Sequence, residues 1–366
     1  MNTQQISVLI TGVGGGSTGE GLIKSLKLAA TPYRIIAVDA LPISFGFFEV
    51  DAYEQVPSAG SPQYLERILA ICKRENVQVV IPGSEPELKK MSENRKVFED
   101  NGILLLINNA EVISRCMDKW ETYLFLKEHG FDVPQSYLIT EEQQIDEIGL
   151  FPVVIKPIRG GGSSVNAFLA QDKPELEFFV RYLLKQGAVP VAQEYVGSPK
   201  EEYTTGVLHT LDGNFLGSIA LRRQILSGLS SKIRIKNRTQ HPYFDTLAIS
   251  SGYSQGLVGD YRSVRDYAER ISQALHSTGP LNVQCRKTEK GIYTFEINPR
   301  FSGTTVMRAM VGFNEPDILI RHHILGEKIE LPIPYKTGIV ARGLREQYIG
   351  IDQVKNISLE DFIEHQ

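Results

Sequence analysis

The most informative stretch of this sequence reads Asn282-Val283-Gln284 and, after a turn, Glu296-Ile297-Asn298-Pro299-Arg300. Apolar and polar residues alternate in both segments, which predicts two antiparallel strands joined in a hairpin. Residues two apart share one face of a strand, so Glu296 and Asn298 point the same way. Gln284 lies roughly opposite them on the partner strand, and three oxygen donors therefore converge.

These three side chains suit Mg²⁺ or Mn²⁺, because hard cations take carboxylate and amide oxygens and otherwise prefer water and nucleotide phosphates. Pro299 ends the second strand, and the planar guanidinium of Arg300 then follows as a group able to bind phosphoryl oxygens. Phe295 and Ile297, on the other face, are expected to contact a core. Taken alone, the pattern fits equally well a polar hairpin face with an exposed arginine.

The N-terminal third alternates short β-branched runs with helical stretches, which predicts βαβ units around a parallel sheet. The strand at 6–10 leads into a loop where Gly14, Gly16 and Gly19 match G-x-G-x-x-G at the start of a helix. Asp39 lies 20 residues beyond Gly19, where a Rossmann enzyme would hold a ribose hydroxyl of NAD. A tight turn without any nucleotide is the alternative interpretation.

With these motifs in place, the sequence resembles the ATP-grasp superfamily, and within it one half of the large subunit of carbamoyl-phosphate synthase. The matching text is the pair of strands quoted above, followed by Ser302-Gly303-Thr304. The resemblance implies that Gln284, Glu296 and Asn298 hold the metal ions. It also implies that Arg300 contacts the phosphate in transfer.

The nucleotide-binding elements of that superfamily are matched upstream in their usual order. Lys119 and Lys156 occupy the positions of the two cationic residues that bind the phosphates in that superfamily. Lys156 and Arg300 are the residues expected to act in catalysis. The loop that closes over the phosphates corresponds to Gly160, Gly161, Gly162 and Ser163. The hinge strand that contacts adenine corresponds to Glu194, Tyr195 and Val196, and the ribose ligand corresponds to Glu202.

The expected fold class is α/β and α+β. A Rossmann-like domain at residues 1–112, of the kind that precedes the ATP-grasp fold, is followed by a two-subdomain ATP-grasp fold. Its small or lid subdomain covers 113–192, its C-terminal subdomain covers 193–330, and an extension of unassigned structure covers 331–366. A helical segment between residues 110 and 130 links the first domain to the lid.

The amino-acid composition limits the kinds of partner that this protein is expected to bind. The 366 residues are 42% hydrophobic and 22% charged, and a formal net charge of -4 gives no basic field for nucleic acid or an anionic membrane. Three cysteines without metal-ligand spacing fit a reducing cytoplasm, and no apolar run is long enough to cross a bilayer. We expect small-molecule carboxylate and amine substrates and a cytoplasmic protein, with a homodimer suggested by analogy alone.

Four further residues are candidates for substrate binding. Glu85 and Glu87 follow the strand at 77–81, at the carboxyl end where ligand sites of α/β sheets form, and could meet a substrate amine. Arg223 and Lys232 could bind phosphate or a substrate carboxylate. The alternative for these basic residues is a solvated strand face.

The resemblance implies an ATP- and Mg²⁺-dependent carboxylate–amine ligase that acts through an acyl phosphate. Carbamoyl-phosphate synthase has two such halves, so synthesis of carbamoyl phosphate by this chain is doubtful. Lys119 and Lys156 stand where that enzyme uses arginines, as in amino-acid and peptide ligases, and Gln284 replaces an acid that most such ligases have. The alternatives are an NAD-dependent oxidoreductase and a nucleotide-binding protein without turnover.

Overall fold

The computed structural model describes residues 5–14, 18–160, 165–239 and 244–349. Its N-terminal unit is a five-stranded parallel sheet in the order β3-β2-β1-β4-β5. The predicted βαβ units are confirmed. The strands are β1 (Ile6–Thr11), β2 (Tyr33–Asp39), β3 (Ala52–Gln55), β4 (Val79–Ile81) and β5 (Leu104–Leu105), and the helices are α1 (Thr18–Lys27), α2 (Tyr64–Arg74), α3 (Glu85–Glu93) and α4 (Arg95–Asp100).

Alternate residues of β1 pack on opposite faces of this sheet. Val8 and Ile10 join the apolar residues of α1, such as Leu22, whereas Leu9 joins those of α2, such as Ile68. All of these side chains are fully buried, and each stabilises the fold by roughly 1.5–3 kcal/mol relative to exposure. The sheet is thus covered on both faces, as a parallel sheet requires.

Two short helices, not one, follow the first unit. They are α5 (Ala110–Cys116) and α6 (Lys119–Glu128), and the chain leaves helical geometry between them. The Asp118 carboxylate accepts hydrogen bonds from the N–H groups of Trp120 and Glu121 and so caps the start of α6. This cap places Lys119 at the first position of α6.

A small antiparallel sheet in the order β6-β9-β7-β8 forms the lid that was expected after these helices. Helix α7 (Lys173–Lys185) covers one face, and its Leu176, Val180 and Leu183 are buried against the strands. The strands are β6 (Ser136–Leu138), β7 (Val153–Pro157), β8 (Phe168–Ala170) and β9 (Pro190–Glu194).

The C-terminal region is built on a six-stranded sheet in the order β16-β15-β10-β11-β14-β17, antiparallel throughout. Strand β17 lies in the extension that had no expected structure, and it pairs with β14. The elements are β10 (Glu202–His209), β11 (Phe215–Arg223), β14 (Gly256–Gly259), α8 (Arg262–Ala274), β15 (Pro280–Lys287), β16 (Ile292–Asn298), α9 (Thr305–Met310), α10 (Glu315–Leu325) and β17 (Gly338–Val340).

A separate hairpin of β12 (Ser231–Lys236) and β13 (Thr246–Ser250) reaches from this region to the lid. Its Leu247 is fully buried with Leu169 of the lid and with Tyr195, which follows β9. The proposed boundary at residues 192 and 193 therefore separates segments that share a small apolar cluster.

The register of β15 and β16 bears out one expectation and corrects another. Gln284 pairs with Glu296, as the alternation predicted. One step along, Cys285 pairs with Thr294, so Phe295 has no partner in the ladder. This bulge reverses the facing of Phe295, which lines the pocket described below rather than a core. Ile297 does lie in a core, as expected.

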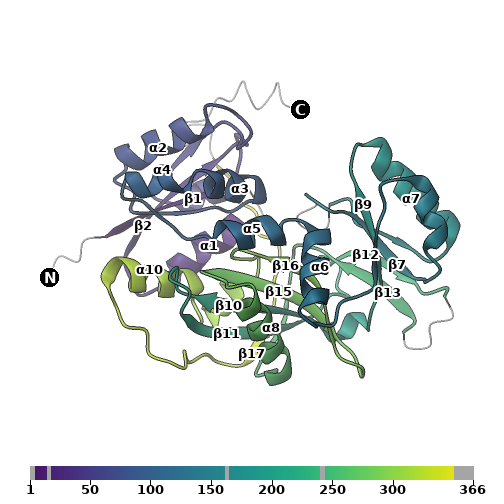
Figure 1. Cartoon of the computed structure of the whole chain (residues 1–366). Coiled ribbons are helices and arrows are strands. Elements are labelled where there is room, and N and C mark those ends of the chain that lie inside the picture. Colours follow the sequence, from purple (N-terminus) through teal and green to yellow (C-terminus); the bar gives the residue numbers. More distant parts are fainter. Residues whose placement is uncertain (1–4, 15–17, 161–164, 240–243, 350–366) are drawn as a thin grey trace.

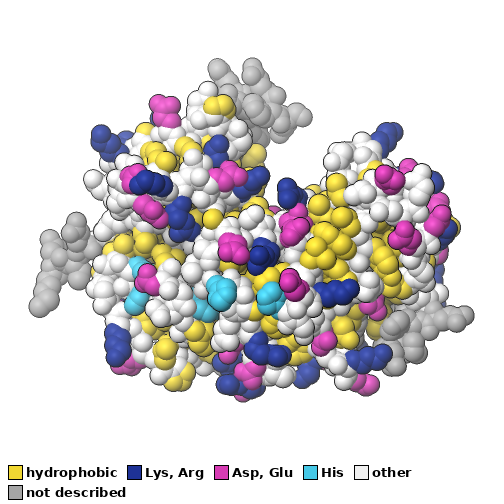
Figure 2. Space-filling model, viewed as in Figure 1, with side chains coloured by type: hydrophobic (Ala, Val, Ile, Leu, Met, Phe, Trp, Pro, Cys, Tyr) yellow, Lys and Arg dark blue, Asp and Glu magenta, His cyan; other side chains and the backbone are white. Residues whose placement is uncertain are grey.

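Figure 1 shows the first unit and the lid as two lobes, with the C-terminal sheet below and between them. A single apolar cluster runs from the first sheet through α1 into α9, α10 and the C-terminal sheet, which joins these two units firmly. The face seen in Figure 2 is hollowed between the first unit and the lid. Within the described residues, no helix combines the length and apolar character that crossing a bilayer demands.

Candidate nucleotide and substrate site

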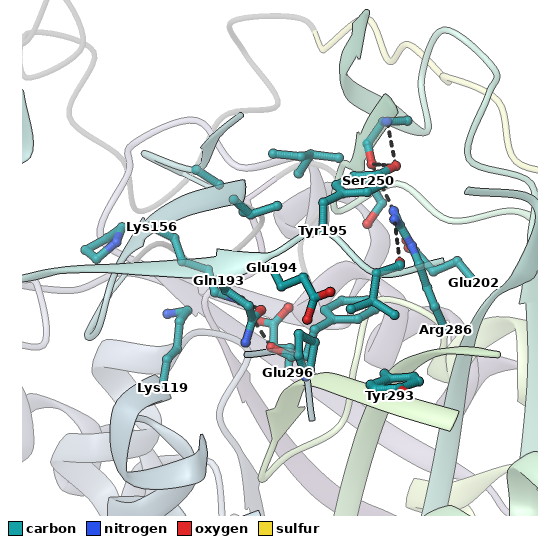
Figure 3. Close-up of a pocket in the computed structure, with 18 of the residues that line it drawn as sticks. Lys119, Lys156, Gln193, Glu194, Tyr195, Glu202, Ser250, Arg286, Tyr293 and Glu296 are labelled. Atoms are coloured by element: carbon teal, nitrogen blue, oxygen red, sulfur yellow. Dashed lines mark hydrogen bonds and ion pairs between the residues drawn. The ribbon is translucent and has the colours of Figure 1, made fainter. Parts of the chain in front are cut away.

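A pocket lies between the lid and the C-terminal sheet, and most of the expected nucleotide residues line it. Figure 3 shows Lys119 and Lys156 at one end of this pocket and Glu202 and Arg286 at the other. The structure brings together residues that are far apart in the sequence, namely Lys119, Lys156, Glu194, Tyr195, Val196, Glu202 and Glu296. Two lysines at one end and a mixed polar and apolar wall at the other suit a nucleotide.

The cationic end is formed by two lysines from different elements. Lys156 is buried on β7, where its ammonium donates to Gln193 Oε1 over 2.9 Å and to the carbonyl of Phe295 over 3.1 Å. Burial lowers the pKa of Lys156 to about 8; the cation of Lys119 acts in the same direction, and Glu296 opposes it. Lys119 donates to the carbonyl of Gly160 over 2.9 Å. A bound phosphate would favour the charged form of Lys156.

The glycine-rich loop was expected to cover this end. Gly160 is described and adopts a φ of +70°, a conformation that favours glycine. Gly161, Gly162 and Ser163 lie outside the described residues. The Lys119 contact with Gly160 nevertheless places the start of the loop beside the two lysines.

The opposite end is flatter and partly apolar. Tyr195 is buried, its hydroxyl receives a hydrogen bond of 2.8 Å from the N–H of Ala248, and Arg286 stacks over its ring at 4.4 Å. Glu194 pairs its backbone with Gln135 of the lid, and Val196 accepts from Arg286. The segment 194–196 thus lines this end of the pocket, and its role as an adenine-binding hinge stays a prediction.

Glu202 is held between two arginines. It is 1% exposed, and one carboxylate oxygen accepts from Arg223 over 2.9 Å. The other oxygen accepts from Arg286 over 2.9 and 3.1 Å. Because the pair of guanidiniums neutralises a fully buried carboxylate, this network has a structural role that the sequence did not indicate. The role of Glu202 as a ribose ligand stays a prediction.

The three expected metal ligands are contiguous. Gln284 donates to Glu296 over 3.0 Å and accepts from Arg223 over 3.0 Å, so its amide oxygen already faces a cation. The amide oxygen of Asn298 accepts from Arg300 at 3.3 Å. A carboxylate and an amide oxygen, with phosphates and water, suit Mg²⁺. Glu296 and Asn298 thus offer donors that fit the ion, whereas Arg223 occupies the amide oxygen of Gln284. The role of all three residues as metal ligands stays a prediction.

Glu296 also lies where three cavities meet. It lines the nucleotide pocket, a smaller pocket that includes Lys119 and Glu85, and a polar pocket that includes Arg300. The polar pocket is rich in hydroxyl groups, which come from Thr18, Thr204, Ser250, Ser251, Ser254, Ser302 and Thr304. A phosphate near Glu296 would therefore be open to attack from the polar side.

The four candidate substrate residues differ in their contacts and in their exposure. Glu85 accepts from Arg300 over 2.9 Å and so faces the site. Glu87 points inward and is bonded by the hydroxyls of Ser84 and Tyr64 over 2.7 and 3.3 Å. Arg223 is buried, which removes the solvated-face alternative for it, whereas Lys232 is exposed on β12 and lines none of these three pockets.

Gly14 and Gly19, which flank residues 15–17 of the first glycine loop, both pack against their own sheet, whereas residues 15–17 lie outside the described residues. Asp39, the residue that would hold an NAD ribose, accepts from the N–H groups of Gly14 and Leu41 over 2.8 and 2.9 Å. A Cβ on Gly19 would lie 2.3 Å from the carbonyl oxygen of Gly12, so glycine is required there for close packing. These contacts favour the tight-turn interpretation of the motif.

Sequence reasoning missed Arg286 and Tyr293, which both line the nucleotide pocket. A signal for Arg286 was present, because it lies two residues beyond Gln284 on the same strand and so shares its face. Tyr293 carried no such signal, because the bulge at Phe295 shifts the alternation of β16.

Comparisons with known proteins agree with this arrangement. Residues 8–106 match the family model described as PylC-like, N-terminal domain, and residues 250–346 match the model described as ATP-grasp in the biosynthetic pathway with Ter operon. A D-alanine--D-alanine ligase of Fusobacterium nucleatum is 28% identical over 210 residues. That alignment covers 56% of this chain and 64% of the ligase, which is less than two thirds of its length.

Solved structures share the fold at low identity. N5-carboxyaminoimidazole synthetase from Staphylococcus aureus, complexed with ADP, has a TM-score of 0.63 and 14% identity, covering 93% of this chain and 82% of that one. L-amino acid ligase from Bacillus licheniformis has a TM-score of 0.60 and 16% identity, covering 88% and 74%. The parallel N-terminal sheet and the antiparallel sheets that follow it occur in the same arrangement in such proteins.

Proposed function

We propose, from the premise that the chain belongs to the ATP-grasp superfamily, that it uses ATP and Mg²⁺ to activate a carboxylate as an acyl phosphate and then joins it to an amine. The observation that carries this proposal is the position of Glu296 at the meeting point of three cavities. A nucleotide in the first cavity and a carboxylate in the polar cavity would meet at this residue, and an amine would then attack the acyl phosphate formed there.

The binding step follows from charge and shape. The adenine and ribose would lie along 194–196 and toward Glu202, with the phosphates at Lys119 and Lys156. When bound, Mg²⁺ at Glu296 and Asn298 would neutralise charge on the phosphates. The lysines add two further positive charges in a site that β7 and β16 shield from water.

The chemical step needs positioning more than covalent help. A carboxylate oxygen in the polar pocket would form a bond to the γ-phosphorus as the bond to ADP breaks, and Arg300 would stabilise the charge on the transferring phosphoryl group. The amine nitrogen would then form a bond to the acyl carbon while the bond to phosphate breaks. The products are an amide, ADP and inorganic phosphate.

The sequence resembles carbamoyl-phosphate synthase, whereas the proteins that match here include ligases of amino acids. We favour an amino-acid or peptide ligase, because both phosphate-binding cations are lysines. The homodimer, the cytoplasmic location and the three boundaries between the four segments stay predictions.

The test combines binding with turnover. We expect the protein to bind an ATP analogue in the presence of Mg²⁺ by calorimetry and to release ADP with some member of a panel of carboxylates and amines. Lys156→Gln should weaken the binding and abolish ADP release, whereas Lys287→Gln, an exposed lysine of β15, should change neither. Stabilisation by NAD with no response to ATP would overturn the proposal, and binding without ADP release over the panel would leave a nucleotide-binding protein without turnover.

A further inference from the structure

A second groove lies between α1, α9 and the chain after β17. Its volume is about 440 Å³, within the size range of small-molecule sites, and it lies outside the nucleotide pocket. Residues of the first unit line one side, and residues 340–345 of the extension line the other. The proposed function does not use this groove.

The base of the groove is apolar and its walls are cationic. Val306, Met307 and Val340 are buried beneath it, and Met310 and Leu344 remain exposed at its edge. Three cations line it, namely Lys24, Arg342 and Arg345, against a single acid, Glu20. An anion with an apolar body complements such a surface.

Two of these cations already have acidic partners. Lys24 pairs with Glu20 on α1, and Arg345 pairs with Glu49 over 2.7 Å. Both also flank the ring of Phe45, at 5.8 and 5.7 Å from its centre. Their charge is therefore largely compensated within the protein.

Arg342 differs from them. Among the residues that the structure describes, none of the ion pairs within 4.0 Å involves its guanidinium, which donates to the carbonyl of Gly303 over 2.7 Å. Burial lowers the pKa of Arg342, and Glu20 raises it from a longer distance. A guanidinium that is partly withdrawn from water and bonded at one nitrogen retains donors for a planar, bidentate anion such as a carboxylate.

The groove adjoins the reacting end of the polar pocket. Gly303, the residue bonded by Arg342, lines that pocket together with Arg300. Thr18, at the start of α1, lies 3.5 Å from Arg300, and Glu20 and Gly21 of the same helix line the groove. A molecule seated in the groove would thus lie beside the position proposed for the acyl phosphate.

We propose that this groove binds the amine substrate, that this substrate is an amino acid with an apolar side chain, and that Arg342 binds its carboxylate. The proposal rests on the function proposed above. The apolar base at Met307 and Val340 would hold the side chain, and the amino group would point toward the polar pocket. The extension would then be a part of the active site.

The experiment measures binding by calorimetry to the whole chain with Mg²⁺ and an ATP analogue present. The probes are L-leucine, L-methionine and L-phenylalanine, and the amides of the same amino acids, which lack the carboxylate. The variants are Arg342→Ala and Arg342→Gln, of which the second keeps a donor for Gly303. Arg262→Ala, an exposed arginine on α8, is the matched control.

We expect at least one amino acid to bind at least tenfold more tightly than its amide, and both Arg342 variants to lose that difference while still binding the nucleotide. Arg262→Ala should keep it. Equal binding of acids and amides, unchanged discrimination in both Arg342 variants, or nucleotide binding without affinity for any of the three amino acids would overturn the proposal. Absence of nucleotide binding in the unmodified protein would instead contradict the proposed ATP-dependent function.

Discussion

The guanidinium of Arg300 donates to the carboxylate of Glu85 over 2.9 Å, although the two residues are 215 positions apart. This ion pair joins the end of β16 to the start of α3 and so connects the C-terminal sheet with the first unit. Both side chains are only partly exposed, at 14% and 25%, and the pair borders the cavities at Glu296. Glu85 is therefore placed to orient Arg300, together with Thr18 and Asn298.

Removing either partner should affect turnover more than nucleotide affinity. Arg300→Ala is expected to lower kcat by about 100-fold, because a positioned donor to the transferring phosphoryl group is lost. Glu85→Gln should lower kcat by about tenfold through misplacement of Arg300. The KM for ATP should change less than threefold in both. Steady-state ADP release measures these effects, with Glu66→Gln on α2 as the control, and an unchanged kcat in Glu85→Gln would show that Glu85 does not position Arg300.

The affinity for ATP should fall as the pH rises above 8. Burial holds the pKa of Lys156 at about 8 in the free protein, so this lysine loses its charge between pH 7 and pH 9. If the charged form is the one that binds phosphate, the affinity at pH 9 should be about tenfold lower than at pH 7. Calorimetry in buffers of different ionisation enthalpy should show proton uptake on binding near pH 8. Lys156→Gln should remove this proton uptake. If the uptake persists in that variant, another group takes up the proton.

The buried carboxylate of Glu202 should be important for stability. Glu202→Gln leaves Arg223 and Arg286 buried without a negative partner, which should lower the free energy of unfolding by about 3–5 kcal/mol. Its neighbour Glu201 pairs with Arg222 at the surface, so Glu201→Gln should cost less than about 1 kcal/mol. Urea unfolding of the two variants compares their free energies of unfolding. Equal losses of this free energy would mean that solvent reaches the Glu202 network.

Sequence patterns predicted the parts of the site that depend on local periodicity. The pairing of Gln284 with Glu296 follows from the period of two along each strand, and the structure has it. The side-chain direction of Phe295 did not follow, because the bulge depends on how β16 packs against its neighbours. The contact of Glu202 with Arg286 spans 84 positions, and no pattern within one strand specifies it.

The secondary-structure elements could likewise be predicted only in part. Alternating strands and helices predicted the parallel sheet, whose shortest strand, β5, has two residues. The break between α5 and α6 could have been inferred from Asp118, a favourable N-cap residue ahead of Lys119. Strand β17 could not, because its three residues become a strand only by pairing with β14.

Restoring an acid at position 284 should strengthen metal binding. Gln284→Glu would place a second carboxylate beside Glu296, and hard divalent cations bind more tightly as the negative charge of their ligands increases. We expect the Kd for Mn²⁺ with bound ADP to fall about tenfold. Without metal, repulsion between the two carboxylates should lower the Tm, although Arg223 partly offsets it. Calorimetry and thermal melting measure the two effects, and an unchanged Kd would exclude position 284 from the metal site.

Glu87 should make the stability of the first unit depend on pH. Burial raises the pKa of this carboxyl to about 7, Asp39 acts in the same direction, and the hydroxyl of Ser84 opposes both. The protonated form is thus favoured in the folded state relative to the unfolded chain, where the pKa is close to 4.5. The group stabilises the fold fully below pH 4.5, and this contribution is lost as the pH rises through 7.

Glu87→Gln replaces the carboxyl with a neutral side chain of the same shape. The free energy of unfolding of the unmodified protein should therefore fall relative to that of Glu87→Gln by roughly 3 kcal/mol between pH 4.5 and pH 8. Urea unfolding at several pH values measures this difference. Glu93→Gln, an exposed acid at the end of the same helix, should give a curve parallel to that of the unmodified protein. If the difference in the free energy of unfolding between Glu87→Gln and the unmodified protein stays constant over this range, Glu87 is ionised in the folded state. Tyr64 and Ser84 would then stabilise its charge more than burial opposes it.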